Sequence, residues 1–372
     1  MKIGIDARLI DETGVGRYIR NLIENLGRLD SHNRYIVFLR KKSFPGFQIP
    51  NARWEKRLAD VPWHTVVEQL VMPWLYIREH LDVVHVPYFN VPIFYPKTLI
   101  VTIHDVIILH FATGKSTTLP MWLYHIRRLG YWIVLKVGVL RARLILAVSE
   151  TTKHELVRHF SVPDRKIRIT HEGVDLRLQN LHTKFRDDRR IIKGPYFLYV
   201  GNVYPHKNIE VLTEAFGKIS PNCRLVLVGR SDFFYERLRE NVKKEQFADR
   251  VVFFGEASDS QLMNLYAYAT ALVYPSRMEG FGLPPLEALA LECPVITSDI
   301  PIFREILGDL SIYFDPDNST ELANILSKML MEPVNTTWKK RARNYASSFR
   351  WETMAERTLA AYEYCVRIRP DQ

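Results

Sequence analysis

Two glutamates on either side of a glycine turn are the side chains in this sequence best suited to binding a ligand. Glu279 precedes Gly280-Phe281-Gly282-Leu283, and Glu287 follows after two prolines. The glycines allow the backbone to approach a ligand closely. The prolines favour the start of a helix, which would place Glu287 in its first turn. Two such carboxylates could bind one polyhydroxylated ligand at two places. In the alternative interpretation Glu279 lies on the surface and Glu287 only caps a helix.

A lysine directly before an expected helix gives a second candidate site. The loop of residues 201–208, GNVYPHKN, follows an expected strand, and Lys207 precedes a helix that begins at Ile209. The N-terminus of a helix has a partial positive charge, which a neighbouring lysine increases. This arrangement favours an anion such as a phosphate group. The alternative is an exposed lysine with no binding role.

The first half of the chain contains a glycine pair and a histidine in comparable positions. Gly14 and Gly16 follow the first expected strand and could bring backbone N–H groups to a phosphate, or could form only a tight turn. A dinucleotide fingerprint needs a third glycine where Ile19 stands, so a nicotinamide site is not supported. His104 ends an apolar strand at an edge where it could reach a ligand. Its alternative is a structural histidine bonded to Asp105.

Short apolar runs alternate with amphipathic helical patterns along the chain. Continuous apolar strands are typical of parallel sheets covered on both faces, so the repeated units predict doubly wound α/β sheets. Expected strands cover residues 2–6, 35–39, 83–86, 99–104, 143–148, 196–200, 224–228, 251–254, 271–274 and 294–297. Expected helices cover residues 16–26, 150–160, 209–219, 260–269, 285–291 and 351–367.

A polar stretch without periodicity, residues 179–194, predicts a linker between two domains of similar size. We therefore expect an N-terminal domain in residues 1–180 and a second domain in residues 190–350. The terminal helical segment, residues 351–372, follows no further strand and must pack at the domain junction or beyond it.

The positive charge of the chain is concentrated in its first half. The 372 residues have a net charge of +10, and residues 1–180 contain 26 basic against 16 acidic residues, which is the whole excess. Such a half could bind nucleic acid, anionic lipid or a phosphorylated substrate, or be basic only for solubility. Residues 119–143 mix aromatic, aliphatic and basic side chains. This mixture is typical of amphipathic helices at an anionic membrane, or of a buried helix with extended arginines.

Other features exclude several classes of protein. Cys223, Cys293 and Cys365 are too widely spaced for a disulfide framework or a zinc motif, so a reducing compartment is expected. The only Asp-x-Asp candidate, Asp315-Pro-Asp317, is expected to form a turn, so no metal is predicted. The N-terminus lacks the apolar run of a signal peptide, and no apolar run is long enough to predict a membrane-spanning helix.

The pattern Glu279-x7-Glu287 with its Gly-Phe-Gly resembles the signature of retaining glycosyltransferase family 4, which has the GT-B fold. The resemblance implies two Rossmann-like domains facing a cleft, with the C-terminal helix crossing back to the first domain. The loops GVGRY and GN…PHKN are most similar to a bacterial mannosyltransferase-like branch that builds surface polysaccharides. Further similar segments are Ile103-His-Asp105, Val148-Ser-Glu150, Val228-Gly-Arg230, Phe254-Gly255 and Phe349-x-Trp351.

The resemblance also implies roles for single residues. His104, Glu279 and Lys207 would be the catalytic residues, with His104 near the donor sugar and the acceptor hydroxyl, Glu279 on sugar hydroxyls and Lys207 on the diphosphate. Glu287 would bind the ribose hydroxyls. The family often has an arginine where this chain has Asn202, so a second phosphate cation would have to come from Arg17, Arg230 or Arg277, or be absent. The donor-binding set would be Gly14, Gly16, Asn202, Gly229, Arg230, Gly255, Gly280, Phe281, Gly282, Leu283 and Glu287.

The implied activity is transfer of a hexose, with mannose expected, from a nucleotide-diphosphate sugar to a glycan or lipid-linked diphosphate acceptor in bacterial surface polysaccharide synthesis. Cationic groups at the diphosphate would stabilise the leaving group, so neither a metal nor another cofactor is expected. The protein would be cytoplasmic, either free or peripheral on the inner face of the cell membrane. The alternatives are a sugar-nucleotide epimerase or hydrolase of the same fold, and a nucleic-acid-binding protein, which would need aromatic side chains interleaved with phosphate contacts.

Overall fold

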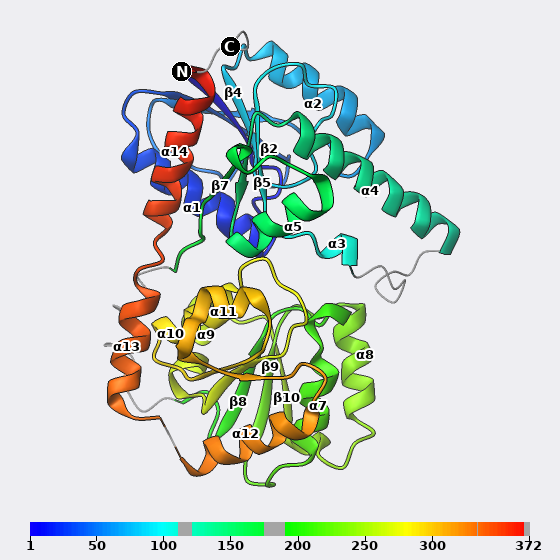
Figure 1. Ribbon diagram of the computed structural model, residues 1–372, viewed down its shortest axis with the longest axis vertical. Helices are drawn as coiled ribbons and strands as arrows, with labels where there is room; N and C mark the ends of the chain where they lie inside the picture. The colour runs from blue at the N-terminus through cyan, green and yellow to red at the C-terminus, as the bar shows by residue number, and fades with distance from the viewer. Residues whose placement is uncertain (111–120, 175–189, 333, 368–372) are drawn as a thin grey trace. The chain divides into compact units, whose positions relative to one another are not determined.

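The chain divides into two compact units. The computed structural model describes residues 1–110, 121–174, 190–332 and 334–367 (Figure 1). One unit consists of Met1–Gly173 and Trp351–Gln372, and the other of Val174–Arg350. The predicted linker at residues 179–194 falls mostly outside the described residues. Within those residues, no helix is long and apolar enough to cross a membrane.

The first unit is built on a seven-stranded parallel sheet with the order β3-β2-β1-β4-β5-β6-β7. Every residue of β4, β5 and β6 is buried, as expected for strands covered on both faces. The strands are β1 (Lys2–Asp6), β2 (Arg34–Leu39), β3 (Trp54–Leu58), β4 (Val83–Val86), β5 (Leu99–Ile103), β6 (Leu144–Ala147) and β7 (Ile167–Ile169). The helices are α1 (Gly14–Leu29), α2 (Val66–Arg78), α3 (Ile107–His110), α4 (Met121–Arg141), α5 (Glu150–Phe160) and α14 (Trp351–Arg367).

The second unit contains a six-stranded parallel sheet with the order β10-β9-β8-β11-β12-β13. Its strands are β8 (Tyr196–Val200), β9 (Arg224–Val228), β10 (Val251–Gly255), β11 (Ala271–Tyr274), β12 (Val295–Ser298) and β13 (Ser311–Phe314). Its α-helices are α7 (Ile209–Gly217), α8 (Phe233–Val242), α9 (Asp259–Tyr268), α10 (Leu283–Ala290), α11 (Pro301–Leu307), α12 (Ser319–Met331) and α13 (Thr336–Ala346). The two sheets confirm the predicted α/β class with doubly wound parallel sheets.

Each sheet has a point at which the chain reverses its direction of winding. In the first unit the strands run outward from β1 to β3, and the chain then returns to place β4 on the other side of β1. In the second unit the same reversal lies between β8 and β11. Open α/β sheets bind ligands outside the carboxyl ends of the strands at such a point. The loops that follow β8 and β11 are therefore the positions at which a ligand is expected.

The C-terminal helix α14 belongs to the first unit, where it packs against α1. In Figure 1 the red α14 lies beside the blue α1. A buried polar chain connects it to the sheet, because the Tyr362 hydroxyl lies 2.7 Å from Nδ1 of His85 and Nε2 of His85 lies 2.7 Å from the Thr102 hydroxyl. Burial lowers the pKa of His85 to about 3, so the ring is neutral at pH 7.

Candidate functional site

The loops after β8 and β11 meet at the reversal point of the second unit. The backbone N–H of Arg277, in the loop after β11, donates a 2.8 Å hydrogen bond to the carbonyl of His206, in the loop after β8. Lys207 ends the short 3-10 turn Pro205–Lys207, and α7 follows two residues later. The topology thus brings together the two loops that the sequence singled out separately.

An ion pair between Lys207 and Glu279 lies at the centre of this site. Lys207 Nζ is 2.5 Å from Oε1 of Glu279 and 3.2 Å from the Tyr274 hydroxyl. The Ser276 hydroxyl donates a 2.6 Å hydrogen bond to the same carboxylate oxygen. The side chains of the pair are only 11% and 9% exposed, which rules out both an exposed Lys207 and a surface Glu279. Each charge is compensated by the other, which avoids burying an unpaired ion.

His206 adds no positive charge to the loop at neutral pH. Burial, followed by the charge of the adjacent Lys207, lowers the pKa of His206 to about 4. The cation that the β8 loop can offer to a phosphate is therefore Lys207.

Three glycines form the carboxyl edge of β8, β9 and β10. The N–H of Gly201 donates to the carbonyl of Val228, and the N–H of Gly229 donates to the carbonyl of Gly255. A side chain at Gly229 would come within 2.2 Å of the Gly201 carbonyl oxygen, and Gly255 has φ +81°. A side chain is therefore excluded by contact at Gly229 and disfavoured by the backbone conformation at Gly255.

The two polar residues predicted beside these glycines differ in exposure. Arg230 lies on the exposed surface next to Gly229. Oδ1 of Asn202 is buried and has no hydrogen-bond partner. A ligand hydroxyl or N–H at this edge could supply the missing donor.

Helix α10 begins directly after the glycine turn, and Gly282 is its N-cap with φ +90°. Residues 280–283 are buried, and the ring of Phe281 meets that of Phe349 edge-on at a centroid distance of 6.0 Å. The expectation that Glu287 lies in the first turn of this helix was wrong. The helix starts at Leu283, so Glu287 is its fifth residue, is 5% exposed and accepts a 3.4 Å hydrogen bond from the Tyr266 hydroxyl.

The glycine pair of the first unit lies inside a helix and not in a loop before it. Helix α1 begins at Gly14, two residues earlier than expected. A side chain at Gly16 would come within 2.5 Å of the Ile10 carbonyl oxygen, so close packing explains this glycine. Gly14 has open space around its Cα, and the Thr13 side chain does not cap the helix. Of the two glycines, Gly14 is therefore the one near which an anion could bind, at the first turn of α1.

His104 lies just beyond β5, and its hydrogen-bond partners are not the Asp105 of the alternative interpretation. Nδ1 is 3.0 Å from Oε1 of Glu172, and Nε2 is 3.1 Å from the carbonyl oxygen of Pro87. Both partners offer oxygen atoms, and together they hold the ring from two sides. The ring also meets Tyr18 edge-on at 4.8 Å. A ligand could hydrogen-bond to a ring nitrogen only by replacing one of these partners.

A buried charged cluster at the carboxyl end of β1 was missed by the sequence analysis. Arg8 contacts Asp6 at 2.7 Å and Glu68 at 2.6 Å, and all three are nearly inaccessible to solvent. Burial raises the pKa of Glu68, which Arg8 partly counteracts, whereas Arg8 holds the pKa of Asp6 below its usual value despite burial. In the sequence, the available indication of this cluster was Arg8, which follows the strand of residues 2–6 after one alanine. The cluster lies at the reversal point of the first unit.

The Asp-x-Asp pair, Asp315 and Asp317, forms a turn as expected. The backbone N–H of Asp317 donates a 2.9 Å hydrogen bond to Oδ1 of Asp315. Asp317 also lies 2.5 Å from Nη2 of Arg277, so this candidate for a second phosphate cation already has a carboxylate partner.

Comparison with known families agrees with this fold. The profile described as glycosyl transferases group 1 matches residues 182–347, and the profile described as Glycosyltransferase Family 4 matches residues 13–178. Together the two profiles cover most of the chain. The protein therefore belongs to the family 4 glycosyltransferases of the GT-B fold, and it is a glycosyltransferase.

Two curated relatives are O-antigen mannosyltransferases. O-antigen chain mannosyltransferase RfbU of Salmonella typhimurium is 28% identical over 83% of this chain and 81% of its own length. O-antigen chain mannosyltransferase B of Escherichia coli is 30% identical over 60% of this chain, and the match spans 61% of its length.

Solved structures show the same fold at low sequence identity. Sucrose-phosphate synthase from Thermosynechococcus elongatus matches with a TM-score of 0.77 and 22% identity over 98% of both chains. Anabaena HepE in complex with UDP and glucose matches with a TM-score of 0.74 and 16% identity, over 98% of this chain and 100% of that one.

Proposed function

We propose that this glycosyltransferase moves a mannosyl group from a nucleotide-diphosphate sugar, GDP-mannose as the first candidate, to a growing surface polysaccharide, with retention of configuration and without a metal. The buried Lys207–Glu279 pair at the reversal point of the second unit is the observation on which the proposal rests. The names of the mannosyltransferase relatives support mannose. The presence of UDP in the HepE complex supports a nucleoside diphosphate donor.

The ion pair suits a donor whose diphosphate leaves during the reaction. A bound diphosphate would attract the Lys207 ammonium and leave the Glu279 carboxylate to accept hydrogen bonds from sugar hydroxyls. As the sugar–phosphate bond breaks, negative charge grows on the phosphate oxygens, where Lys207 and the N-terminus of α7 stabilise it. The departing phosphate oxygen can then take the proton of an acceptor hydroxyl that attacks from the same face.

The other donor contacts follow from the positions of the surrounding groups. The glycine edge of β8, β9 and β10 would receive the nucleotide, because Gly201, Gly229 and Gly255 have no side chain of their own. Glu287 would bind ribose hydroxyls from within α10, and the Asn202 amide would contribute in place of the arginine that many family members have. The uncapped first turn of α1 at Gly14 would bind phosphate, and His104 with its partner Glu172 would act near the transferring sugar.

The lipid-linked acceptor and membrane part of the proposal rests on exposed apolar side chains of α2 and α4. On α2, Val66, Leu70, Trp74 and Ile77 are all exposed and recur every three or four residues, which places them on one face. On α4, Leu135 and Val139 are buried, so the helix is amphipathic, and its exposed apolar residues include Ile126, Leu129, Trp132 and Ile133. We call these eight exposed residues the α2–α4 surface.

The segment from Val91 to Tyr95 contacts both helices of the α2–α4 surface, and basic side chains of α4 lie beside it. Gln69 of α2 donates to the Val91 carbonyl and accepts from the Ile93 N–H. Arg141 of α4 donates a 2.8 Å hydrogen bond to the Tyr95 carbonyl. Lys136 lies over the Trp132 ring at 4.6 Å. Apolar and aromatic side chains beside cations suit the headgroup region of an anionic bilayer.

Nucleotide titration tests the donor site. We expect GDP to bind the unaltered protein, and Lys207→Ala and Glu287→Gln each to weaken that binding by roughly 1.5–3 kcal/mol, the range for a hydrogen bond to a charged group. Titrations with GDP, GDP-mannose, UDP and UDP-glucose would identify the base and the sugar. Lys243→Ala, which removes an exposed lysine of the same unit, is the matched control and should bind as the unaltered protein does. Unchanged affinity in both site variants would disprove the assignment.

Product analysis distinguishes transfer from the alternative activities. With GDP-mannose and a polyprenyl-diphosphate oligosaccharide acceptor, the product should contain an added mannose with the donor's anomeric configuration. Release of free sugar or of an isomeric nucleotide sugar at the same rate without acceptor would instead indicate a hydrolase or an epimerase.

A further inference from the structure

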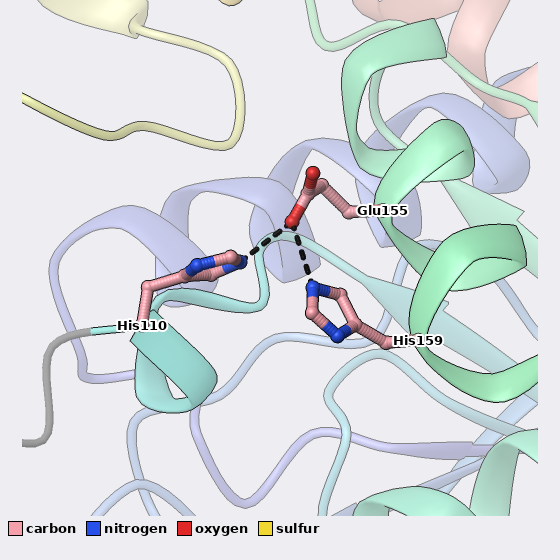
Figure 2. A group of neighbouring side chains, drawn as sticks. All are labelled: His110, Glu155 and His159. Carbon is pink, nitrogen blue, oxygen red and sulfur yellow. Dashed lines mark hydrogen bonds and ion pairs between the residues drawn. The ribbon is translucent and has the colours of Figure 1, made fainter.

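We propose that His110, Glu155 and His159 of the first unit form a binding site for a divalent transition metal ion of the Zn²⁺ class, which ties α3 to α5. Figure 2 shows the Glu155 carboxylate between the two imidazole rings. His110 is the last residue of α3, whereas Glu155 and His159 are four residues apart on one face of α5. The site belongs to neither of the donor-binding loops, and the proposal does not depend on the proposed function.

Three side-chain atoms that could bind a metal ion already lie close together in this structure. Oε2 of Glu155 lies 2.6 Å from Nε2 of His110 and 3.3 Å from Nε2 of His159. One ligand atom from each residue lies within 4.8 Å of the other two. Atoms that share a tetrahedral Zn²⁺ at bond lengths of about 2.0–2.2 Å lie roughly 3.4 Å apart. Small rotations of partly exposed side chains would reach that separation.

The ligand types determine which ion fits. Two imidazole nitrogens and one carboxylate oxygen suit Zn²⁺, and also Co²⁺ or Ni²⁺, whereas Mg²⁺ and Ca²⁺ prefer oxygen ligands only. Binding through Nε2 leaves the ring proton of each histidine on Nδ1. The three side chains are 35%, 20% and 32% exposed, so the ion can enter from solvent and water can complete its coordination.

The position of the site gives the ion a structural effect. Helix α3 begins three residues after His104, and the Thr152 hydroxyl of α5 donates a 3.3 Å hydrogen bond to the His104 carbonyl. One helix, α5, therefore contacts both ends of the segment from His104 to His110. In this structure the far end is held by the hydrogen bond between His110 and Glu155, and a shared ion would replace it with coordinate bonds.

Calorimetric titration of the full-length, tag-free and chelator-treated protein with ZnCl₂ tests the proposal. We expect one Zn²⁺ per chain and a higher thermal midpoint with Zn²⁺. His110→Ala, Glu155→Gln and His159→Ala should each weaken binding by at least about tenfold, since each removes a metal ligand. His154→Ala, an exposed histidine of the same helix, is the matched control and should bind as the unaltered protein does.

Two further measurements locate the ion and its effect. Co²⁺ should give the visible absorption of a low-coordinate nitrogen and oxygen site, and this absorption should be lost in His159→Ala. Zn²⁺ should slow amide hydrogen exchange in residues 104–110 of the unaltered protein but not of that variant. No binding at about 0.1 mM Zn²⁺, or equal binding by the unaltered protein and all three ligand variants, would overturn the proposal.

Discussion

At the scale of single residues, Glu172 is the group that the structure adds to the predicted catalytic set. It lies 3.0 Å from Nδ1 of His104, and both side chains are largely buried. A carboxylate in this position fixes the ring orientation, as partners of functional histidines commonly do. We therefore propose that Glu172 is a positioning residue that acts through His104.

We predict that Glu172→Gln lowers kcat about tenfold and that His104→Ala lowers it on the order of a hundredfold, because both changes affect groups near the transferring sugar. The affinity for GDP should stay unchanged, since neither residue is among the proposed nucleotide contacts. Steady-state kinetics and GDP titration of the same preparations measure the two quantities. Glu150→Gln, an exposed glutamate of the same unit, is the control. A variant with normal kcat, or with parallel losses in kcat and GDP affinity, would contradict this role.

A second prediction at this scale concerns the phosphate cation. Lys207 and the N-terminus of α7 supply positive charge that a metal ion supplies in other transferases. Transfer activity should therefore persist in excess EDTA, although the chelator should lower the thermal midpoint if the proposed site on α3 and α5 holds Zn²⁺. Loss of activity that Mg²⁺ or Mn²⁺ restores, but Zn²⁺ does not, would show that the phosphate site needs a metal.

At the scale of secondary-structure elements, the buried His85 makes the joint between the sheet and α14 sensitive to acid. Its pKa is lowered from 6.5 to about 3 in the folded protein, so between these values the unfolded chain binds a proton that the folded chain does not. The stability that the neutral His85 ring gives to the folded protein is complete above about pH 6.5 and is lost as the pH falls toward 3. The free energy of unfolding should decrease by about 1.4 kcal/mol per pH unit for this one proton.

Urea denaturation at pH 7, 6, 5 and 4 measures this effect, and His85→Asn should reduce the pH slope by about one proton. The exposed His32→Asn should leave it unchanged. Identical slopes in the unaltered protein and His85→Asn would show that the ring is not neutral and buried as described.

Several elements could be predicted from sequence because their signals are local. The strands β1, β8, β9 and β11 have the predicted bounds, since continuous apolar runs identify buried parallel strands. The edge strand β3 was missed because its sequence, WEKRL, is polar and mostly exposed.

Some positions of the site residues could likewise be predicted from the sequence, and others could not. The meeting of Lys207 and Glu279 follows from topology, because both loops leave the carboxyl ends of adjacent strands. The Glu172 partner of His104 could not be predicted, since 68 residues separate the two and no local pattern connects them. The error on Glu287 came from assigning the helix start to a proline, whereas α10 begins one residue before Pro284.

At the scale of the whole molecule, charge and apolar exposure are both concentrated in the N-terminal half of the sequence. Residues 1–180 contain the entire net charge of +10, and the exposed face of α2 includes Leu70 and Trp74, which are 64% and 56% exposed. Monomeric soluble proteins rarely expose such contiguous apolar surface without a partner. Basic charge attracts an anionic bilayer, and the apolar side chains can then insert at the headgroup boundary, so each feature accounts for a part of the binding that the other does not.

We therefore predict that the protein sediments with vesicles that contain anionic lipid but not with purely zwitterionic vesicles. Each basic residue near an anionic surface contributes on the order of 1 kcal/mol, and salt screens this attraction, so binding should fall steeply by about 0.5 M NaCl. Arg127→Glu/Arg128→Glu should weaken the attraction, and Leu70→Glu/Trp74→Glu should prevent insertion. Phe233→Glu/Met331→Glu introduces the same two charges at exposed apolar residues of the second unit and is the matched control. Equal binding to both vesicle types, or loss of binding in the control as large as in the α2 variant, would contradict a membrane role of the α2–α4 surface and favour a soluble acceptor.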